Sequence, residues 1–265
     1  MHPQLFQGLI FIEPVIQETI PPGPNAALFT SLRPDLWNSF EEAKTHFMNN
    51  KFYKSWDRRA LEKYIQHGLR STPTALHPNA PVGAVTLATP KTQEAWSYVR
   101  STFSPLPQDD QLDDRERLIT GDYTSEHAKY LFIRSEAAVA LNLLPHVKPS
   151  VKWIFGGKSY INRPTDRDEK ISRTGTASRG NGGVSVAVIE RGGHLVPLEM
   201  ISETADEIAP YIQEQLGNYV KEKAFWATYD SGKSKNDSLE LSDQWIKNVR
   251  QGSGILRPVN RKGKL

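Results

Sequence analysis

The stretch from residue 184 to residue 199, VSVAVIERGGHLVPLE, constrains the fold of this chain most strongly. Its apolar, β-branched opening predicts a buried strand over Val184–Ile189. Arg191-Gly192-Gly193 then ends the strand, because glycine tolerates left-handed backbone. His194 follows at the tip of this loop, where open α/β sheets place their chemistry, beside the carboxyl ends of parallel strands. The stretch therefore predicts an α/β fold and a functional role for His194; the alternative is an ordinary polar turn histidine.

Two further runs predict strands of the same sheet. Leu9–Ile12 is closed by Glu13-Pro14, and Val151–Phe155 ends in the polar loop Gly156-Gly157-Lys158-Ser159. A buried parallel strand needs neighbours on both sides, so a strand this close to Met1 indicates a cut through a larger domain. Without such neighbours, Leu9–Ile12 would be an exposed sheet edge.

The segment between these two strands has a different composition and predicts a largely helical insert. It opens with the rigid linker Pro21-Pro22-Gly23-Pro24. Helical patterns follow at Trp37–Asn49 and Asp57–Gly68, and Val82–Thr89 is expected to be a short strand or extended segment. Aromatic residues of this insert are expected mainly to pack its own core.

Four parts are therefore expected along the chain: a core strand (1–16), an insert (17–149), the C-terminal part of the core (150–223) and a polar tail (224–265). A crossover helix is expected near Asp166–Arg173 and another helix over Ser202–Leu216. Pro210 interrupts the latter pattern, so either the helix kinks there or its main part begins at Pro210.

Composition excludes several function classes. The 265 residues carry 33 basic and 30 acidic side chains, a net charge of +3 that is mixed along the chain and gives no nucleic-acid footprint. The absence of cysteine excludes disulfides, thiolate catalysis and cysteine-bound metals. We expect no membrane span, since no apolar run approaches ~20 residues, and neither metal nor cofactor, since no two histidines stand at ligand spacing with a carboxylate.

Four segments of the chain resemble fungal α/β-hydrolases, both the peroxisomal-lipase-like type and the type found in host-selective toxin clusters. They are Leu9–Ile16 (LIFIEPVI), Thr89–Trp96 (TPKTQEAW), Trp153–Ile161 (WIFGGKSYI) and Gly193–Glu199 (GHLVPLE). The resemblance implies the C-terminal part of an α/β-hydrolase: parallel core strands with flanking helices and a largely helical lid.

The same resemblance implies a serine-type mechanism in which His194 is the general base. Hydrolases of this fold raise their serine on a G-x-S-x-G elbow, which this sequence lacks; the family's elbow would lie upstream of Met1. Ser159 stands near the usual position of the acid and cannot hold an imidazolium by charge. Glu13, after the preceding strand, is the alternative acid, or else a strand-end glutamate that faces solvent or caps a turn. Asp166 and Asp168 are weaker candidates.

The implied reaction is hydrolysis of an acyl ester or thioester, in toxin or other secondary-metabolite biosynthesis. Because the nucleophile is missing, a non-catalytic hydrolase remnant that binds a ligand or partner is the alternative. A membrane- or nucleic-acid-associated module rests only on four basic residues near the C-terminus, Arg257, Arg261, Lys262 and Lys264. Gly263-Lys264-Leu265 resembles a peroxisomal address and predicts recognition by an import receptor, with the cytoplasm as the alternative location.

Overall fold

The structure is a computed structural model that describes residues 5–23, 25–101, 118, 127–177, 183–229, 232, 234 and 239–252. The chain divides into two compact units, Met1–Gln215 and Leu216–Leu265. Gly263-Lys264-Leu265 and the four basic residues near the C-terminus lie outside the described residues. Among the described helices, none combines the length and the apolar character that crossing a bilayer requires.

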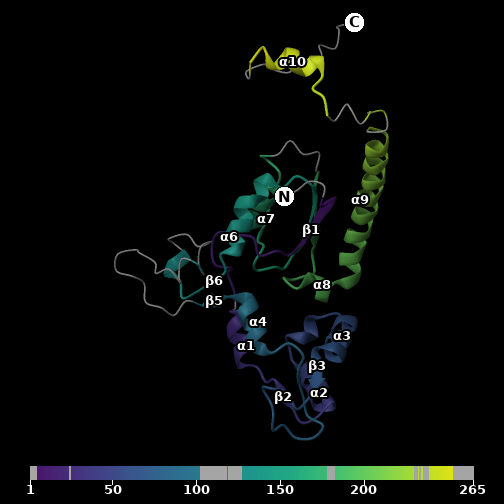
Figure 1. Ribbon diagram of the computed structural model, residues 1–265. Coiled ribbons are helices and arrows are strands. Elements are labelled where there is room, and N and C mark those ends of the chain that lie inside the picture. The colour runs from purple at the N-terminus through teal and green to yellow at the C-terminus, as the bar shows by residue number, and fades with distance from the viewer. Residues whose placement is uncertain are drawn as a thin grey trace. The chain divides into compact units, whose positions relative to one another are not determined.

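The first unit is built on a three-stranded parallel sheet (Figure 1). Its strands are β1 (Gly8–Ile12), β7 (Ser150–Gly156) and β8 (Val184–Ile189), in the order β1-β7-β8. The register places Phe11 beside Trp153, and Trp153 beside Val186. Parallel neighbours need long crossovers, which here are the insert before β7 and α7 (Pro164–Arg173) before β8.

Helices pack on both faces of this sheet, because alternate side chains of β7 point to opposite sides. Trp153 and Phe155 pack with Leu141 and Leu144 from α6 (Glu136–Leu143) and the 3₁₀ turn η3 (Leu144–His146). On the other face, Ile154 packs with residues from α8 (Val196–Glu199) and α9 (Ile201–Tyr229). The predicted α/β core with flanking helices is confirmed.

The predicted strand β8 is present, but the prediction that it is buried is wrong. Val184, Val186 and Val188 are 39%, 41% and 38% exposed, and Ile189 is the buried side chain of the strand. The cause is the position of β8 at one edge of the described sheet, where it pairs with β7 alone. β1 forms the other edge, and its five residues are half-buried.

The insert is helical, as expected, but it also contains a small antiparallel sheet. Its helices within the described residues are α1 (Ala26–Leu32), α2 (Phe40–Asn49), α3 (Arg58–Gly68), α4 (Lys91–Tyr98) and α6, with 3₁₀ turns η1 (Tyr53–Ser55) and η2 (His127–Lys129). The sheet joins β2 (Leu36–Trp37), β4 (Val85–Leu87) and β3 (Leu69–Ser71), and β5 (Arg100–Ser101) pairs with β6 (Phe132–Ile133).

One strand of the insert agrees with the sequence prediction, and the start of one helix differs from it. The strand expected within Val82–Thr89 is present at Val85–Leu87. Trp37 was expected to start a helix but lies in β2, since its ring packs with Phe47 in the core of the insert. Ser39 starts α2 instead, because its side chain accepts a hydrogen bond from the backbone N–H of Glu42.

Pro210 does not begin a new helix, so that alternative is wrong: α9 runs continuously through it. A proline inside a helix costs ~3 kcal/mol, which must be offset by packing. Tyr211 supplies part of that packing, because its side chain is buried and its hydroxyl lies 2.8 Å from Ser150 Oγ of β7.

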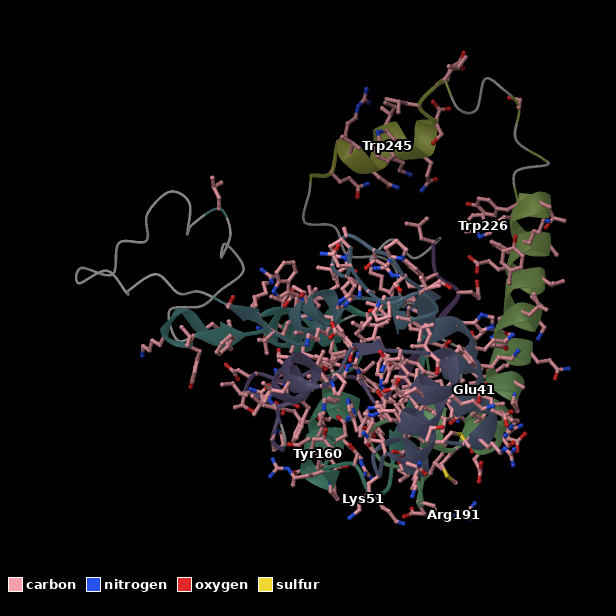
Figure 2. The ribbon with its side chains drawn as sticks, turned by 90° about the horizontal axis from the view of Figure 1, so that it is seen from below. Glu41, Lys51, Tyr160, Arg191, Trp226 and Trp245 are labelled. Atoms are coloured by element: carbon pink, nitrogen blue, oxygen red, sulfur yellow. The ribbon has the colours of Figure 1, made fainter. Side chains whose placement is uncertain are left out.

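The second unit contains the end of α9 and α10 (Asp243–Val249). Phe225, Trp226 and Tyr229 form a cluster of mutually contacting rings on α9. Trp226 and Trp245 of this unit, both labelled in Figure 2, are about half exposed.

Candidate active site

Glu13 directly follows β1 and has an unusual backbone conformation. Its φ is +45°, a left-handed value that non-glycine residues seldom adopt. The backbone N–H of Glu13 donates to the carbonyl of Ile154 at 2.9 Å, so the turn is held against β7. This conformation points the carboxylate inward, where only 2% of the side chain is exposed. The alternative of a solvent-facing glutamate is wrong.

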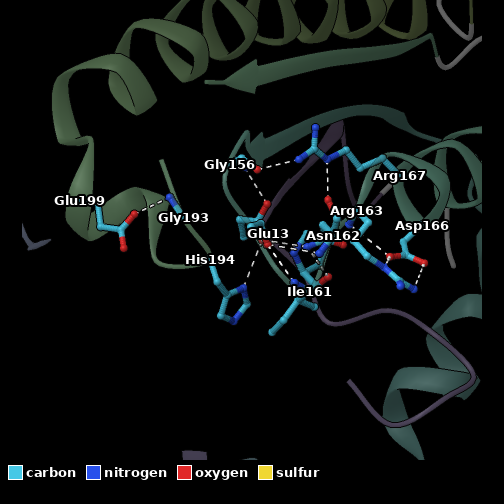
Figure 3. A network of polar contacts seen from close by, with 12 residues as sticks. Glu13, Gly156, Ile161, Asn162, Arg163, Asp166, Arg167, Gly193, His194 and Glu199 are labelled. Atoms are coloured by element: carbon cyan, nitrogen blue, oxygen red, sulfur yellow. Dashed lines mark hydrogen bonds and ion pairs between the residues drawn. The ribbon is translucent and has the colours of Figure 1, made fainter. Parts of the chain in front are cut away.

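Four donors surround the Glu13 carboxylate (Figure 3). Oε1 accepts the backbone N–H of Gly156 at 2.6 Å, and Oε2 accepts Ser159 Oγ at 2.6 Å and Asn162 Nδ2 at 2.9 Å. The fourth is His194, whose Nδ1 lies 3.2 Å from Oε2. Burial alone raises the pKa of Glu13, but these hydrogen bonds outweigh burial and hold the pKa below its usual range. Glu13 is therefore a buried carboxylate that stays ionised at neutral pH.

Two glycine pairs allow the loops after β7 and β8 to meet. A Cβ on Gly156 would lie 2.2 Å from the carbonyl oxygen of Gly193, so no side chain fits there. The loops are joined by a hydrogen bond from Lys158 N–H to the carbonyl of Gly192 at 2.9 Å, and Gly193 N–H donates to the Glu199 carboxylate. The approach of the two loops places His194 over Glu13.

The geometry of His194 suits a general base. With Nδ1 directed at Glu13, the proton of the neutral ring belongs on Nδ1, which leaves the Nε2 lone pair free to accept a proton. The side chain is 24% exposed, so the ring is accessible to small molecules. Tyr160, labelled in Figure 2, lies beside it with ring centroids 6.0 Å apart and is 44% exposed.

The other candidates lie elsewhere. Asp166 belongs to α7 and pairs with Arg163 at 2.8 Å, and Asp168 lies on the same helix. Ser159 is buried and donates its hydroxyl to Glu13, so it supports the carboxylate and is not placed as a nucleophile.

Sequence reasoning missed Asn162 and Lys170, both fully buried beside Glu13. Asn162 donates to Glu13, and Lys170 donates to Asn162 Oδ1. Asn162 stands in a polar crossover and Lys170 on a charged helix, so the sequence offered no signal that either side chain is buried.

A parallel sheet covered by helices on both faces, with a histidine on the loop after β8, agrees with the α/β-hydrolase fold that the four sequence segments predicted. No family model matches the chain. Of solved structures, it is similar to the peroxisomal alpha-beta-hydrolase Lpx1 from Saccharomyces cerevisiae, with a TM-score of 0.51 and 17% identity over 88% of this chain and 58% of that one. This likeness concerns the fold.

Curated relatives add sequence similarity. The chain is 28% identical to a type I acyl-CoA thioesterase, mpaH, from Penicillium roqueforti over 285 aligned positions, 98% of this chain and 62% of the relative. It is 24% identical to the abhydrolase domain-containing protein AFT2-1 from Alternaria alternata, over 80% of this chain and 75% of that protein. The resemblance to fungal α/β-hydrolases is thereby confirmed. The chain spans less than two thirds of the length of the thioesterase.

Proposed function

We propose that this chain carries the general base and the acid of a hydrolase acting on acyl thioesters or esters. The observation that carries the proposal is the hydrogen bond between Nδ1 of a partly exposed His194 and the buried, ionised carboxylate of Glu13. The thioesterase relatives support an acyl-CoA thioester as the substrate class. No resident cofactor is required for this chemistry.

In the proposed reaction, the hydroxyl of a serine, to which no residue of this sequence is assigned, attacks the acyl carbonyl carbon while Nε2 of His194 takes the hydroxyl proton. Glu13 stabilises the imidazolium that forms. The proton passes to the departing thiolate or alkoxide, and the acyl group remains on the serine as an ester. Water then attacks this ester with His194 again as base, which releases the carboxylic acid and restores the serine.

The second candidate is a non-catalytic protein that binds a ligand or partner. The observation in its favour is that the 265 residues contain no G-x-S-x-G elbow. Participation in toxin biosynthesis and peroxisomal import through Gly263-Lys264-Leu265 stay predictions.

One experiment separates the two candidates. Hydrolysis of acyl-CoA and p-nitrophenyl esters is measured for this chain alone and for the longest open reading frame that contains it, each with His194→Ala. We expect at least one of the two forms to hydrolyse these substrates, and we expect His194→Ala to abolish that hydrolysis. His67→Ala, which changes an exposed histidine on α3, is the matched control and should leave the rate unchanged. Absence of hydrolysis in both forms would favour the binding protein.

A further inference from the structure

A lysine is buried close to the proposed acid. Lys170 lies on α7, and only 1% of its surface is exposed. Burial lowers the pKa of its ammonium, and the negative charges of Asp166, Glu13 and Glu169 oppose that shift. A buried cation is unfavourable unless it is paired or hydrogen-bonded, so the side-chain partner of Lys170 is informative. That partner is Oδ1 of Asn162.

The ammonium of Lys170 decides which way the Asn162 amide points. An ammonium can only donate hydrogen bonds, so it holds the Oδ1 end of the amide on the side of α7. The NH₂ end must then face β1, where Nδ2 lies 2.9 Å from Glu13 Oε2 and 3.4 Å from the carbonyl oxygen of Pro14. The flipped amide would place an oxygen against the carboxylate and an NH₂ against the ammonium, both of which are repulsive.

The main chain of Asn162 is fixed as well. Its N–H donates to Ser159 Oγ at 3.2 Å, and its carbonyl accepts from Arg167 Nε at 2.6 Å. Ser159 in turn donates to Glu13, so two arms of one buried network converge on Oε2 (Figure 3). A buried network in which each member is hydrogen-bonded is rigid and favours a single geometry.

We propose that Lys170 is a positioning residue for the Glu13–His194 pair and that it acts through Asn162. By fixing the orientation of the amide, Lys170 keeps a hydrogen-bond donor on Glu13 Oε2 and so keeps the carboxylate ionised and aimed at Nδ1 of His194. This inference rests on the proposed function, because the aim of Glu13 matters to the reaction only if His194 is its base.

The test is the pKa of the Glu13 side chain, measured by carboxyl-carbon NMR in four proteins: wild type, Lys170→Met, Asn162→Ala and the double variant. Methionine keeps most of the aliphatic volume of lysine and removes the donor. We expect Lys170→Met to raise the pKa of Glu13 in the native background and to raise it clearly less when Asn162 is already alanine.

Two outcomes of the comparison between the native and the Asn162→Ala backgrounds would overturn the inference. One is that Lys170→Met does not raise the pKa of Glu13; the other is that it raises this pKa equally in both backgrounds, which would mean that Lys170 acts through its electric field and not through Asn162. Lys152→Met is the matched control, because Lys152 is also largely buried but pairs with Glu207 on the α9 side of the sheet. The control should leave the pKa of Glu13 unchanged, and an equal rise there would also contradict the inference.

A measurement on the wild type covers the case in which Lys170→Met does not fold. The carboxamide protons of Asn162 should exchange with solvent far more slowly than those of exposed asparagines, and equally fast exchange would overturn the inference. None of these readouts needs catalysis. A failure of the hydrolase proposal would therefore show in the activity assay, and a failure of this inference would show in the NMR data.

Discussion

Oε2 of Glu13 lies 3.2 Å from Nδ1 of His194, although 181 positions separate the two residues in the sequence. Glu13 follows β1 and His194 follows β8, and β7 lies between these strands. The carboxyl ends of parallel strands meet at the same edge of a sheet, so the two turns converge there. Neither residue is part of a local motif with the other, and the pair exists only in the folded sheet.

Replacing Glu13 by glutamine should remove most of any hydrolytic activity. Glutamine has the same shape, but its amide can present an N–H to Nδ1 and favour the wrong tautomer of His194. We expect kcat to fall by on the order of 10³–10⁴-fold, as when the acid of a serine-type triad is made neutral. The rate is measured in whichever form of the protein hydrolyses acyl-CoA.

Glu41→Gln is the control for that substitution, because Glu41 is an exposed glutamate of α2 whose side chain is 77% exposed (Figure 2). It should leave kcat within error of the wild type. A Glu13→Gln protein with unchanged kcat would remove Glu13 from the proposed mechanism.

The stability of the protein should depend on pH through Glu13. Its pKa is lower in the folded protein than the ordinary value of 4.5, so ionised Glu13 stabilises the fold fully above pH 4.5. This contribution is lost as the pH falls through the folded pKa. The free energy of unfolding, measured in urea from pH 7 downward, should therefore be higher for the wild type than for Glu13→Gln, and this difference should narrow below pH 4.5. A difference that widens in acid would contradict the lowered pKa of Glu13.

Gly156→Ala should destabilise the protein, because the new Cβ would lie 2.2 Å from the carbonyl oxygen of Gly193 and the two loops must separate. Forcing atoms into a packed site costs about 1–3 kcal/mol of the free energy of unfolding, measured in urea. Gly217→Ala is the control: Gly217 lies on α9, and apart from its chain neighbours and the adjacent backbone of the helix no atom lies within 4 Å of its Cβ position. There alanine should stabilise the helix by about 0.5–1 kcal/mol.

The exposed face of β8 can be tested with Val186→Thr. Threonine keeps the β-branched shape and the strand preference of valine, and Val186 is 41% exposed. The free energy of unfolding should change by no more than about 0.5 kcal/mol. Ile154→Ala, at a position with no exposed surface, should cost about 2–5 kcal/mol. A large loss from Val186→Thr would show that β8 is covered in solution.

Strand positions were predictable because they depend on local pattern. Runs of apolar, β-branched residues at Leu9–Ile12, Val151–Phe155 and Val184–Ile189 predict three strands, which the structure places at Gly8–Ile12, Ser150–Gly156 and Val184–Ile189. The burial of β8 was not predictable in this way, because burial depends on which strands and helices lie beside it. Likewise, no local rule predicts that α9 continues through Pro210.

In the candidate site, too, some residues could be predicted from local sequence pattern and others depend on tertiary packing. His194 and Glu13 each stand at a recognisable strand end, so sequence reasoning could select them as candidates. Asn162 and Lys170 could not be selected, since their contacts with Glu13 and with each other depend on how α7 packs against the sheet. The roles of all four residues stay predictions until activity and protonation are measured.

The most direct test of the central claim is the protonation of His194 itself, read from ¹⁵N NMR of its ring in the wild type and in Glu13→Gln. The account predicts that neutral His194 carries its proton on Nδ1 in the wild type, with Nε2 free, and that Glu13→Gln loses this preference. A wild-type ring protonated on Nε2, or one unaffected by Glu13→Gln, would contradict the claim that Glu13 holds His194 as the base of this site.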